Sequence, residues 1–338
     1  MQELRNKARQ RVKSRCRVCP VCDGRACAGE IPGMGGIGTG MGFRNNFTAL
    51  AAYKINMRVL HDANDPSTRF SLWGREMALP VFAAPVGNMV GNGGSDLTNP
   101  AFTEKYIDGC VAANTLASIG DLADFEDFKS FMRCIRGRGK HVVPFIKPWI
   151  REDVLKRLDY VANAGCDVCG MDVDAAGLTL LRRLSAPVEV KDGEKLAEII
   201  SLAHERGMKF IAKGVMTADE AILAADAGAD AVLVSNHGGR VLDHTPGTAE
   251  VLPAIVEAVG ERVLVMMDGA VRTGVDVLKV LALGAKAALI CRPVAVILHG
   301  DEEKGIPAYF AKIQDELSQA MRLTGCKDIA SITRRVIY

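Results

Sequence analysis

The sequence predicts an α/β protein, a (β/α)8 TIM barrel preceded by a cysteine- and glycine-rich extension. Short continuous apolar runs alternate with amphipathic helical stretches from about Met77 onward, and there are eight such runs. Continuous apolar runs are typical of parallel strands buried on both faces. Eight strand–helix units fit a closed barrel, whose usual size is roughly 250 residues. We therefore place an N-terminal helical and cysteine/glycine-rich segment at 1–76 and the barrel at 77–338.

The expected strands are the eight apolar runs themselves. They lie at LPVFAAPV (79–86), NTLASIG (114–120), HVVPFIK (141–147), VCGMDVD (168–174), KFIAKG (209–214), DAVLVSN (230–236), RVLVMMDG (262–269) and AALICRP (287–293). Helical spacing is clearest in four stretches between them, each ending at a glycine or Gly-Ala stop, at 154–165, 195–207, 218–229 and 274–285. A doubly wound open sheet could use the same units, but eight regular units favour closure.

Composition excludes several classes of function. The chain has 338 residues, 49% hydrophobic and 24% charged, with a net charge of +2, which argues against a surface built for nucleic acid or membrane. No apolar run reaches the roughly 18 residues of a membrane span, and the start, MQELRNKARQRVKSR, lacks a signal-peptide core. We expect a cytoplasmic protein. The basic stretch Arg5–Arg17 has no interleaved aromatic residues and is interpreted as a solvated helix face.

Charged residues gather where the predicted strands end, which is where a barrel builds its active site. In VSNHGGRVLD (234–243), the histidine can take a proton near neutral pH and the arginine can hold a carboxylate with two prongs. The glycines allow backbone to approach a ligand. Counting the other strand ends, the candidate rim residues are Asp172, Asp174, Lys213, His237, Arg240, Asp268, Arg272 and Arg292. So many groups converging on one rim predict an active site.

Four of the ten cysteines lie close together, at Cys16, Cys19, Cys22 and Cys27. Thiolates this close can ligate zinc or an iron–sulfur cluster, although C-x2-C-x2-C-x4-C matches neither common spacing. Redox-active or structural thiols, and unreactive ones, stay open as alternatives. The dispersed cysteines are interpreted as packing residues. The glycine run MGGIGTGMG (34–42) follows no strand, so we expect a cover over the active site and not a phosphate loop.

The segments IAKGV, VSNHGGRVLD, MDGAVRTGVDVLKVLALGA and ICRPV, in this order, resemble the FMN-dependent 2-hydroxy acid oxidases and dehydrogenases, such as glycolate oxidase and lactate oxidase. MRLTGC (321–326) is similar to a segment that closes those chains. The resemblance is dense from 209 to 326, fainter from 79 to 174 and poor before Met77. It implies FMN as the cofactor.

The resemblance also implies residue roles. His237 is the base that takes a proton from the substrate, Asp174 stabilises the imidazolium, and Arg240 binds the substrate carboxylate. Lys213 lies at the flavin pyrimidine edge and stabilises negative charge there. The implied flavin-binding residues are Pro85, Val86, Gly87, Lys213, Ser235, His237, Asp268, Gly269, Arg272, Cys291 and Arg292. Of these, Asp268, Gly269, Arg272 and Arg292 hold the ribityl chain and the phosphate.

Several positions depart from the family pattern. Ile146 stands where a substrate-facing tyrosine is expected, and Pro144 replaces a flavin-contacting glutamine. Gly120 and Asp121 occupy a usual serine pair. Lys147 or Trp149 could compensate, and the arginine expected beyond Asp174 has no clear match, although Arg182 and Arg183 lie close by.

The function expected is oxidation of a small L-2-hydroxy acid to the 2-oxo acid, with oxygen or an electron-acceptor protein as partner and a homo-oligomeric state. Two alternatives stay open. One is an FMN-dependent isomerase of the type 2 isopentenyl diphosphate isomerase kind, against which a carboxylate clamp at Arg240 argues. The other is a flavin- or metal-binding redox sensor.

Overall fold

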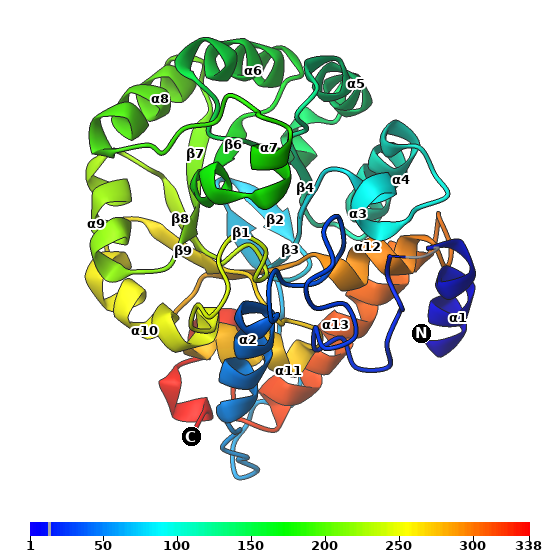
Figure 1. The fold of residues 1–338 in the computed structure, drawn as a ribbon. Helices are drawn as coiled ribbons and strands as arrows, with labels where there is room; N and C mark the ends of the chain where they lie inside the picture. The colour runs from blue at the N-terminus through cyan, green and yellow to red at the C-terminus, as the bar shows by residue number, and fades with distance from the viewer. Residues whose placement is uncertain (13–14) are drawn as a thin grey trace.

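The computed structural model describes residues 1–12 and 15–338, and its centre is a closed barrel of eight parallel strands (Figure 1). Around the barrel the strand order is β10-β3-β4-β5-β6-β7-β8-β9. The strands are β3 (Val81–Val86), β4 (Ala117–Gly120), β5 (Val142–Ile146), β6 (Val168–Asp172), β7 (Lys209–Val215), β8 (Ala231–Val234), β9 (Leu264–Met267) and β10 (Ala287–Ile290). Seven of the predicted apolar runs each contain one whole strand, and β7 ends one residue beyond its run, at Val215. The predicted fold class and closure are therefore confirmed.

Helices surround the barrel as an outer ring (Figure 1). The α-helices of the described residues, of which α7 lies over the barrel centre and α1 outside the ring in Figure 1, are α1 (Gln2–Arg11), α2 (Met41–Ala52), α3 (Met89–Gly93), α4 (Asn99–Ala112), α5 (Phe125–Ile135), α6 (Arg151–Asn163), α7 (Thr179–Arg183), α8 (Gly193–Glu205), α9 (Ala218–Asp226), α10 (Thr248–Val259), α11 (Gly274–Ala282), α12 (Arg292–Leu298) and α13 (Gly305–Arg322). The four predicted helices correspond to α6, α8, α9 and α11. The starts of α8, α9 and α11 are capped by the side chains of Asp192, Thr217 and Thr273, and at α11 Thr273 and Asp276 form a capping box, whereas α6 has no side-chain cap.

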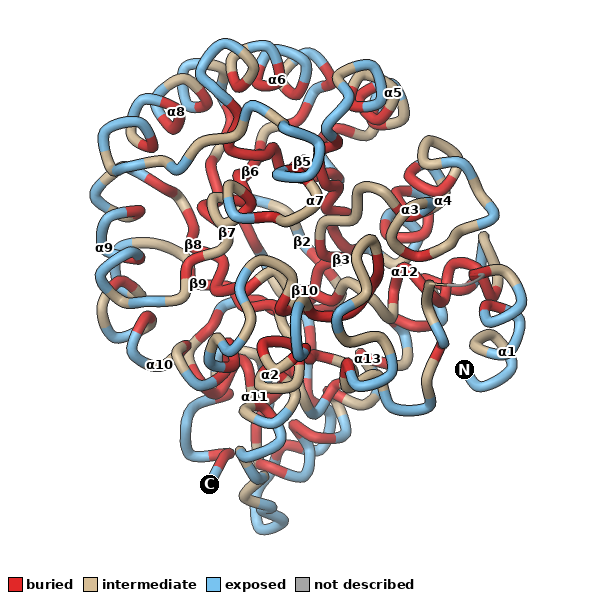
Figure 2. The backbone as a smooth tube through the Cα atoms, in the orientation of Figure 1, coloured by how far each residue is buried: buried red, intermediate tan, exposed pale blue. Residues whose placement is uncertain are grey.

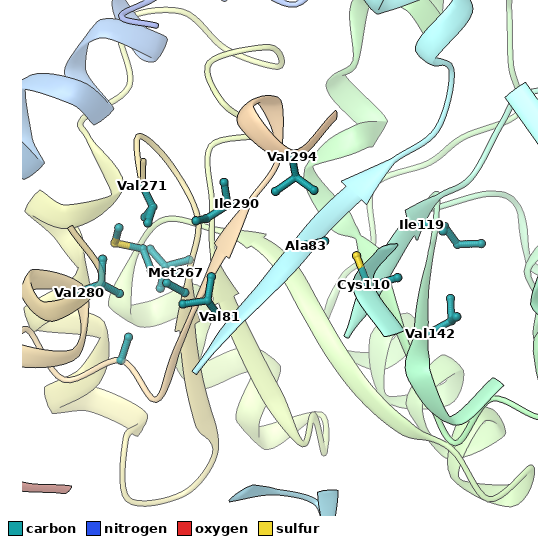
Figure 3. Packing of buried hydrophobic residues seen from close by; sticks show 14 of the residues in the cluster. Val81, Ala83, Cys110, Ile119, Val142, Met267, Val271, Val280, Ile290 and Val294 are labelled. Carbon is teal, nitrogen blue, oxygen red and sulfur yellow. The ribbon is translucent and has the colours of Figure 1, made fainter. Parts of the chain in front are cut away.

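Successive residues of each strand contribute alternately to two separate cores, one between the barrel and the helices and one inside the barrel. In β3, Val81 and Ala83 face the helices, and Figure 3 shows them among the side chains of this outer core. Phe82 and Ala84 belong to the barrel interior. The period-2 alternation of a strand explains the division. Figure 2 shows the strands buried and the outward helix faces exposed, as two-sided burial of a parallel sheet requires.

A short antiparallel hairpin precedes the barrel. It pairs β1 (Phe70–Leu72) with β2 (Arg75–Met77). Leu72 and Met77 join the interior core, so the hairpin packs against the barrel lumen. The division of the chain after residue 76 stays a prediction. Within the described part of the chain, no helix combines the length and the apolar character needed to cross a membrane.

The basic stretch Arg5–Arg17 begins on helix α1, whose Lys7, Arg9 and Gln10 are exposed, as expected of a solvated helix face; residues 13 and 14 of the stretch lie outside the described residues. Arg5 donates to the carbonyl oxygens of Cys19 and Pro20, and Arg9 Nη2 donates to Val18 O at 2.8 Å. The solvated face is confirmed for the exposed Lys7 and Arg9, and the side chains of Arg5 and Arg9 also donate to loop carbonyls. They tie α1 to the cysteine segment.

Candidate active site

The histidine loop begins directly after β8 and is held by side-chain hydrogen bonds. Asn236 Nδ2 donates to Gly42 O at 3.1 Å and accepts, through Oδ1, from Asn46 Nδ2 at 2.8 Å. Gly239 has φ +77° and an added Cβ would lie 2.3 Å from Phe43 N. Only glycine fits there. The loop is therefore locked against α2 and the segment before it.

The glycine run 34–42 lies against this loop, as expected of a cover. Ile37 N donates to Gly239 O at 2.9 Å, and Met34 O accepts from Arg292 Nε at 2.6 Å. Thr39 Oγ1 donates to Asp243 Oδ2 at 2.8 Å. The glycine run and the histidine loop therefore form one packed unit.

His237 and Asp174 form the predicted pair. His237 Nδ1 lies 3.0 Å and 3.2 Å from the two carboxylate oxygens of Asp174, which follows β6. Gly214, at φ +102°, makes room, because a Cβ there would lie 2.5 Å from Asp174 Cγ. Burial and the nearby Lys213 charge lower the pKa of His237, against the opposing effect of Asp174. The imidazole is thus neutral near pH 7, with Nε2 free to accept a proton when Nδ1–H faces the carboxylate.

Behind this pair lies a buried chain of alternating charges. Lys213 Nζ is 2.8 Å from Asp172 Oδ1, and Lys147 Nζ bonds the other oxygen of the same carboxylate. Burial raises the pKa of Asp172, but the two ammonium groups more than offset it and hold the pKa below its ordinary value. Burial lowers the pKa of Lys213, but the neighbouring carboxylates more than offset this effect and raise it above its ordinary value. Lys213 therefore stays charged.

Three arginines of the rim have no carboxylate partner within residues 1–12 and 15–338, the part of the chain that the structure describes. Arg240 Nη2 donates to the neutral Asn92 Oδ1 at 2.9 Å, and Arg292 Nη2 donates to Gly238 O at 3.0 Å. Arg272 Nη1 donates to Val271 O at 2.8 Å. Burial, and then Arg292, lower the pKa of Arg240 to about 10, which leaves it protonated at neutral pH. This wall carries uncompensated positive charge that suits anionic ligands.

A cavity of about 180 Å³ brings most of the predicted site residues together. The predicted residues that line it are Pro85, Gly87, Lys213, His237, Arg240, Asp268, Gly269, Arg272, Cys291 and Arg292. Asp174 lies behind His237, and Ser235 is fully buried and accepts from His237 N at 3.1 Å. Val86 is not among the lining residues.

Two buried atoms on this wall suit FMN. Among the described residues, Asp268 Oδ1 and Arg272 Nε have no hydrogen-bond partner. Burial raises the pKa of Asp268, against Lys213. An unpaired acceptor and an unpaired donor beside uncompensated arginines fit a ligand with hydroxyl groups and an anionic end, which the ribityl chain and phosphate of FMN supply.

The departures from the family pattern have a structural explanation. Asp121 accepts from Arg157 Nε at 2.8 Å and from the Trp149 indole, so it is the centre of a buried network. Trp149 is 1% exposed and packs under Arg157, whose Cζ is 4.4 Å from its ring, so it does not compensate for the missing tyrosine. Ile146 packs in the outer core. Lys147 does line the cavity.

Sequence reasoning missed the side chains that come from the N-terminal third. Asn46, Asn92 and Phe43 touch the rim, the last through its ring 4.1 Å from Arg292 Cζ. Their partners lie far away in sequence, so no local pattern marked them. Arg182 and Arg183 are exposed and line no part of the cavity.

Comparison with known proteins agrees with this site. The family described as FMN-dependent dehydrogenase matches residues 33–186 and 187–338. A peroxisomal (S)-2-hydroxyacid oxidase of Arabidopsis thaliana is 28% identical over 322 residues, 86% of each chain. An L-lactate dehydrogenase of a Caulobacter species is 30% identical over 350 residues, 86% of this chain and 89% of its own. Mandelate oxidase, solved with (S)-2-phenylpropionate, superposes with a TM-score of 0.77 at 25% identity, covering 100% of this chain and 97% of its own. The chain therefore belongs to the FMN-dependent dehydrogenase family and is an FMN-dependent oxidoreductase.

Proposed function

We propose that this protein oxidises a small L-2-hydroxy acid to the 2-oxo acid. The observation that carries the proposal is one cavity that holds both a neutral, carboxylate-backed histidine and an arginine without an acidic partner among the described residues. The first can take a proton and the second can hold a carboxylate, which are the two needs of this substrate class.

The chain's own groups divide the work. Arg240 fixes the substrate carboxylate, and His237 accepts the substrate proton through Nε2. Asp174, 3.0 Å from Nδ1, stabilises the imidazolium that results. Lys213, held charged by Asp172, offers positive charge to the flavin edge. FMN, when bound, supplies the acceptor for the two electrons of the oxidation.

The cavity wall supports an apolar substituent on the acid. Its leucines are Leu122, Leu178, Leu180, Leu181, Leu184 and Leu289. Apolar lining with a few convergent polar groups is the usual composition of a small-molecule site. The proposal therefore favours acids with a hydrocarbon side chain over glycolate.

The proposal includes the flavin-binding set of the sequence analysis: Pro85, Val86, Gly87, Lys213, Ser235, His237, Asp268, Gly269, Arg272, Cys291 and Arg292. It also includes oxygen or an electron-acceptor protein as the oxidant, a homo-oligomer and a metal group on the N-terminal cysteines. Ten cysteines without a disulfide support a reducing compartment, and the cytoplasm is part of the proposal.

The test is an absorption spectrum of the flavin-loaded protein without oxygen, before and after adding L-lactate, glycolate and longer L-2-hydroxy acids. We expect the flavin absorbance to bleach with one or more of them, most readily with an apolar acid. If dithionite bleaches the flavin and none of the acids does, the proposal is wrong. Turnover of isopentenyl diphosphate by the reduced protein, without such bleaching, would assign the site to the isomerase class instead.

A further inference from the structure

We propose that Cys16, Cys19, Cys22 and Cys27 bind an iron–sulfur cluster in a second cavity beside the active site. The site goes beyond the proposed oxidation and does not depend on its substrate. None of the active-site contacts described above uses these thiols, yet the fold gathers all four at one place.

The second cavity measures about 520 Å³, and all four cysteines line it. Its walls also come from α12, α13 and α2, and in Figure 1 the dark blue segment between α1 and α2 runs across this end of the molecule. The residues shared with the active-site cavity are Met34, Ala270, Arg272 and Arg292. The cysteine site and the flavin site are therefore neighbours across two arginines.

The spacing of the thiols favours a cluster over a single zinc ion. Tetrahedral zinc holds its sulfur ligands ~2.3 Å from the metal, so the sulfurs lie only ~3.8 Å apart. Within the described residues, the one group of three ligand atoms all within 4.8 Å of one another is Asp172, Asp174 and His237. No three of the four cysteine sulfurs, all of them in the described part of the chain, lie within 4.8 Å of one another, which is wider spacing than a tetrahedral zinc ion requires.

The sequence pattern points the same way. The four cysteines fall within 12 consecutive residues, whereas structural zinc sites usually pair two separated C-x2-C knuckles. A single run with two x2 spacings is closer to the first three cysteines of the bacterial ferredoxin run, C-x2-C-x2-C, which ligate one cluster. Cys27 supplies the fourth thiol at the same cavity.

The surroundings suit the negative charge of a cluster with four thiolate ligands. Arg272 Nη2 lies 3.7 Å from Cys22 Sγ and 3.5 Å from Cys22 O. Arg5 and Arg9 hold the loop by its carbonyl oxygens, so the backbone around the thiols is fixed. Burial and hydrogen bonds to sulfur are the features by which proteins stabilise clusters and tune their potentials.

The experiment begins with the unmodified chain, purified without oxygen, in which iron, acid-labile sulfide, zinc and flavin are measured together. We expect iron and sulfide in equal amounts, about four of each per chain for a cubane cluster. A paramagnetic signal should also follow dithionite reduction, distinct from that of the flavin. The proposal is overturned if the purified chain contains zinc but no acid-labile sulfide. It is also overturned if the chain binds no iron after reconstitution with iron and sulfide.

Variants then assign the ligands. Cys19→Ser and Cys22→Ser should each lose most of the iron and keep the flavin, and Cys134→Ser, a half-buried thiol elsewhere, should lose neither. Iron that stays after Cys22→Ser overturns the assignment. All these readouts are independent of any 2-hydroxy acid, so a failure of the proposed oxidation and a failure of the cluster are told apart.

Discussion

Two parts of the barrel rim differ in how their buried charges are paired. We call the ends of β4 to β6 the first rim and the ends of β8 to β10 the second rim. At the first rim, Asp121 meets Arg157 at 2.8 Å, and Asp172 meets Lys147. At the second, Arg240 and Arg292 have only neutral partners, at 2.9 Å and 3.0 Å, among the described residues. The two rims face one cavity.

The difference separates residues that stabilise the fold from residues that are available to bind a ligand. Paired charges in the interior satisfy each other and gain nothing from an anion. Unpaired guanidinium groups keep their positive charge available, and they lie where the family resemblance places the flavin phosphate and the substrate carboxylate. Substitutions at the second rim should therefore change chemistry or binding, and substitutions at the first should change stability.

The largest effect is expected at the second rim. His237→Gln should lower kcat by ~10³-fold, because a positioned base contributes about 10² to 10⁴, while the flavin content stays unchanged. Steady-state kinetics and the flavin spectrum measure both. His204→Gln, a partly exposed histidine paired with Asp230 on the outer ring, is the matched control. Wild-type turnover in His237→Gln would remove the base assignment.

The corresponding test at the first rim is the variant Asp121→Asn. It leaves Arg157 buried without its counter-charge, which should cost about 3 kcal/mol of unfolding free energy. Denaturant unfolding followed by fluorescence gives this value from the shift in midpoint. Asp153→Asn, which removes an exposed pair with Lys156, should change it by less than about 0.5 kcal/mol. Equal effects from both variants would mean that the buried network does not stabilise the fold.

A smaller effect separates binding from chemistry. Arg240→Lys keeps the charge but loses the two-pronged geometry, and we expect a loss of about 2 kcal/mol in substrate binding, or a ~30-fold higher KM. Arg262→Lys, in an exposed pair with Asp226, should leave KM unchanged. A fall in kcat with KM unaltered would contradict a role for Arg240 in holding the carboxylate.

The smallest effect is that of pH near neutrality. Burial and Lys213 lower the pKa of His237 below its ordinary 6.5, so the neutral base dominates at pH 7. Raising the pH from 7 to 8 should increase kcat/KM by less than about 1.3-fold, whereas lowering it below the reduced pKa protonates the base and removes activity. An acidic limb centred above pH 7 would show that the environment does not lower the pKa of this histidine.

The barrel and the strand ends that carry the candidate rim residues could be predicted from the sequence, but the partners of the buried charges at the first rim could not. Buried parallel strands produce continuous apolar runs, and the residues after them lie at one edge of the barrel, which is why Asp172, Lys213 and His237 could be placed there. The role of Asp121 depends on Arg157 and Trp149, which reach it from another helix and loop. The contact of Arg240 with Asn92 spans 148 residues. Pairings over such separations leave no periodic signal.

The two arginines that the cavities share make their occupants thermodynamically linked. Arg272 faces Cys22 on one side and the flavin cavity on the other, so a ligand that draws its guanidinium one way changes what it offers the other. By reciprocity, any factor by which filling the larger cavity alters FMN affinity is the factor by which FMN alters affinity there. Depriving the protein of one occupant then changes its affinity for the other by that same factor.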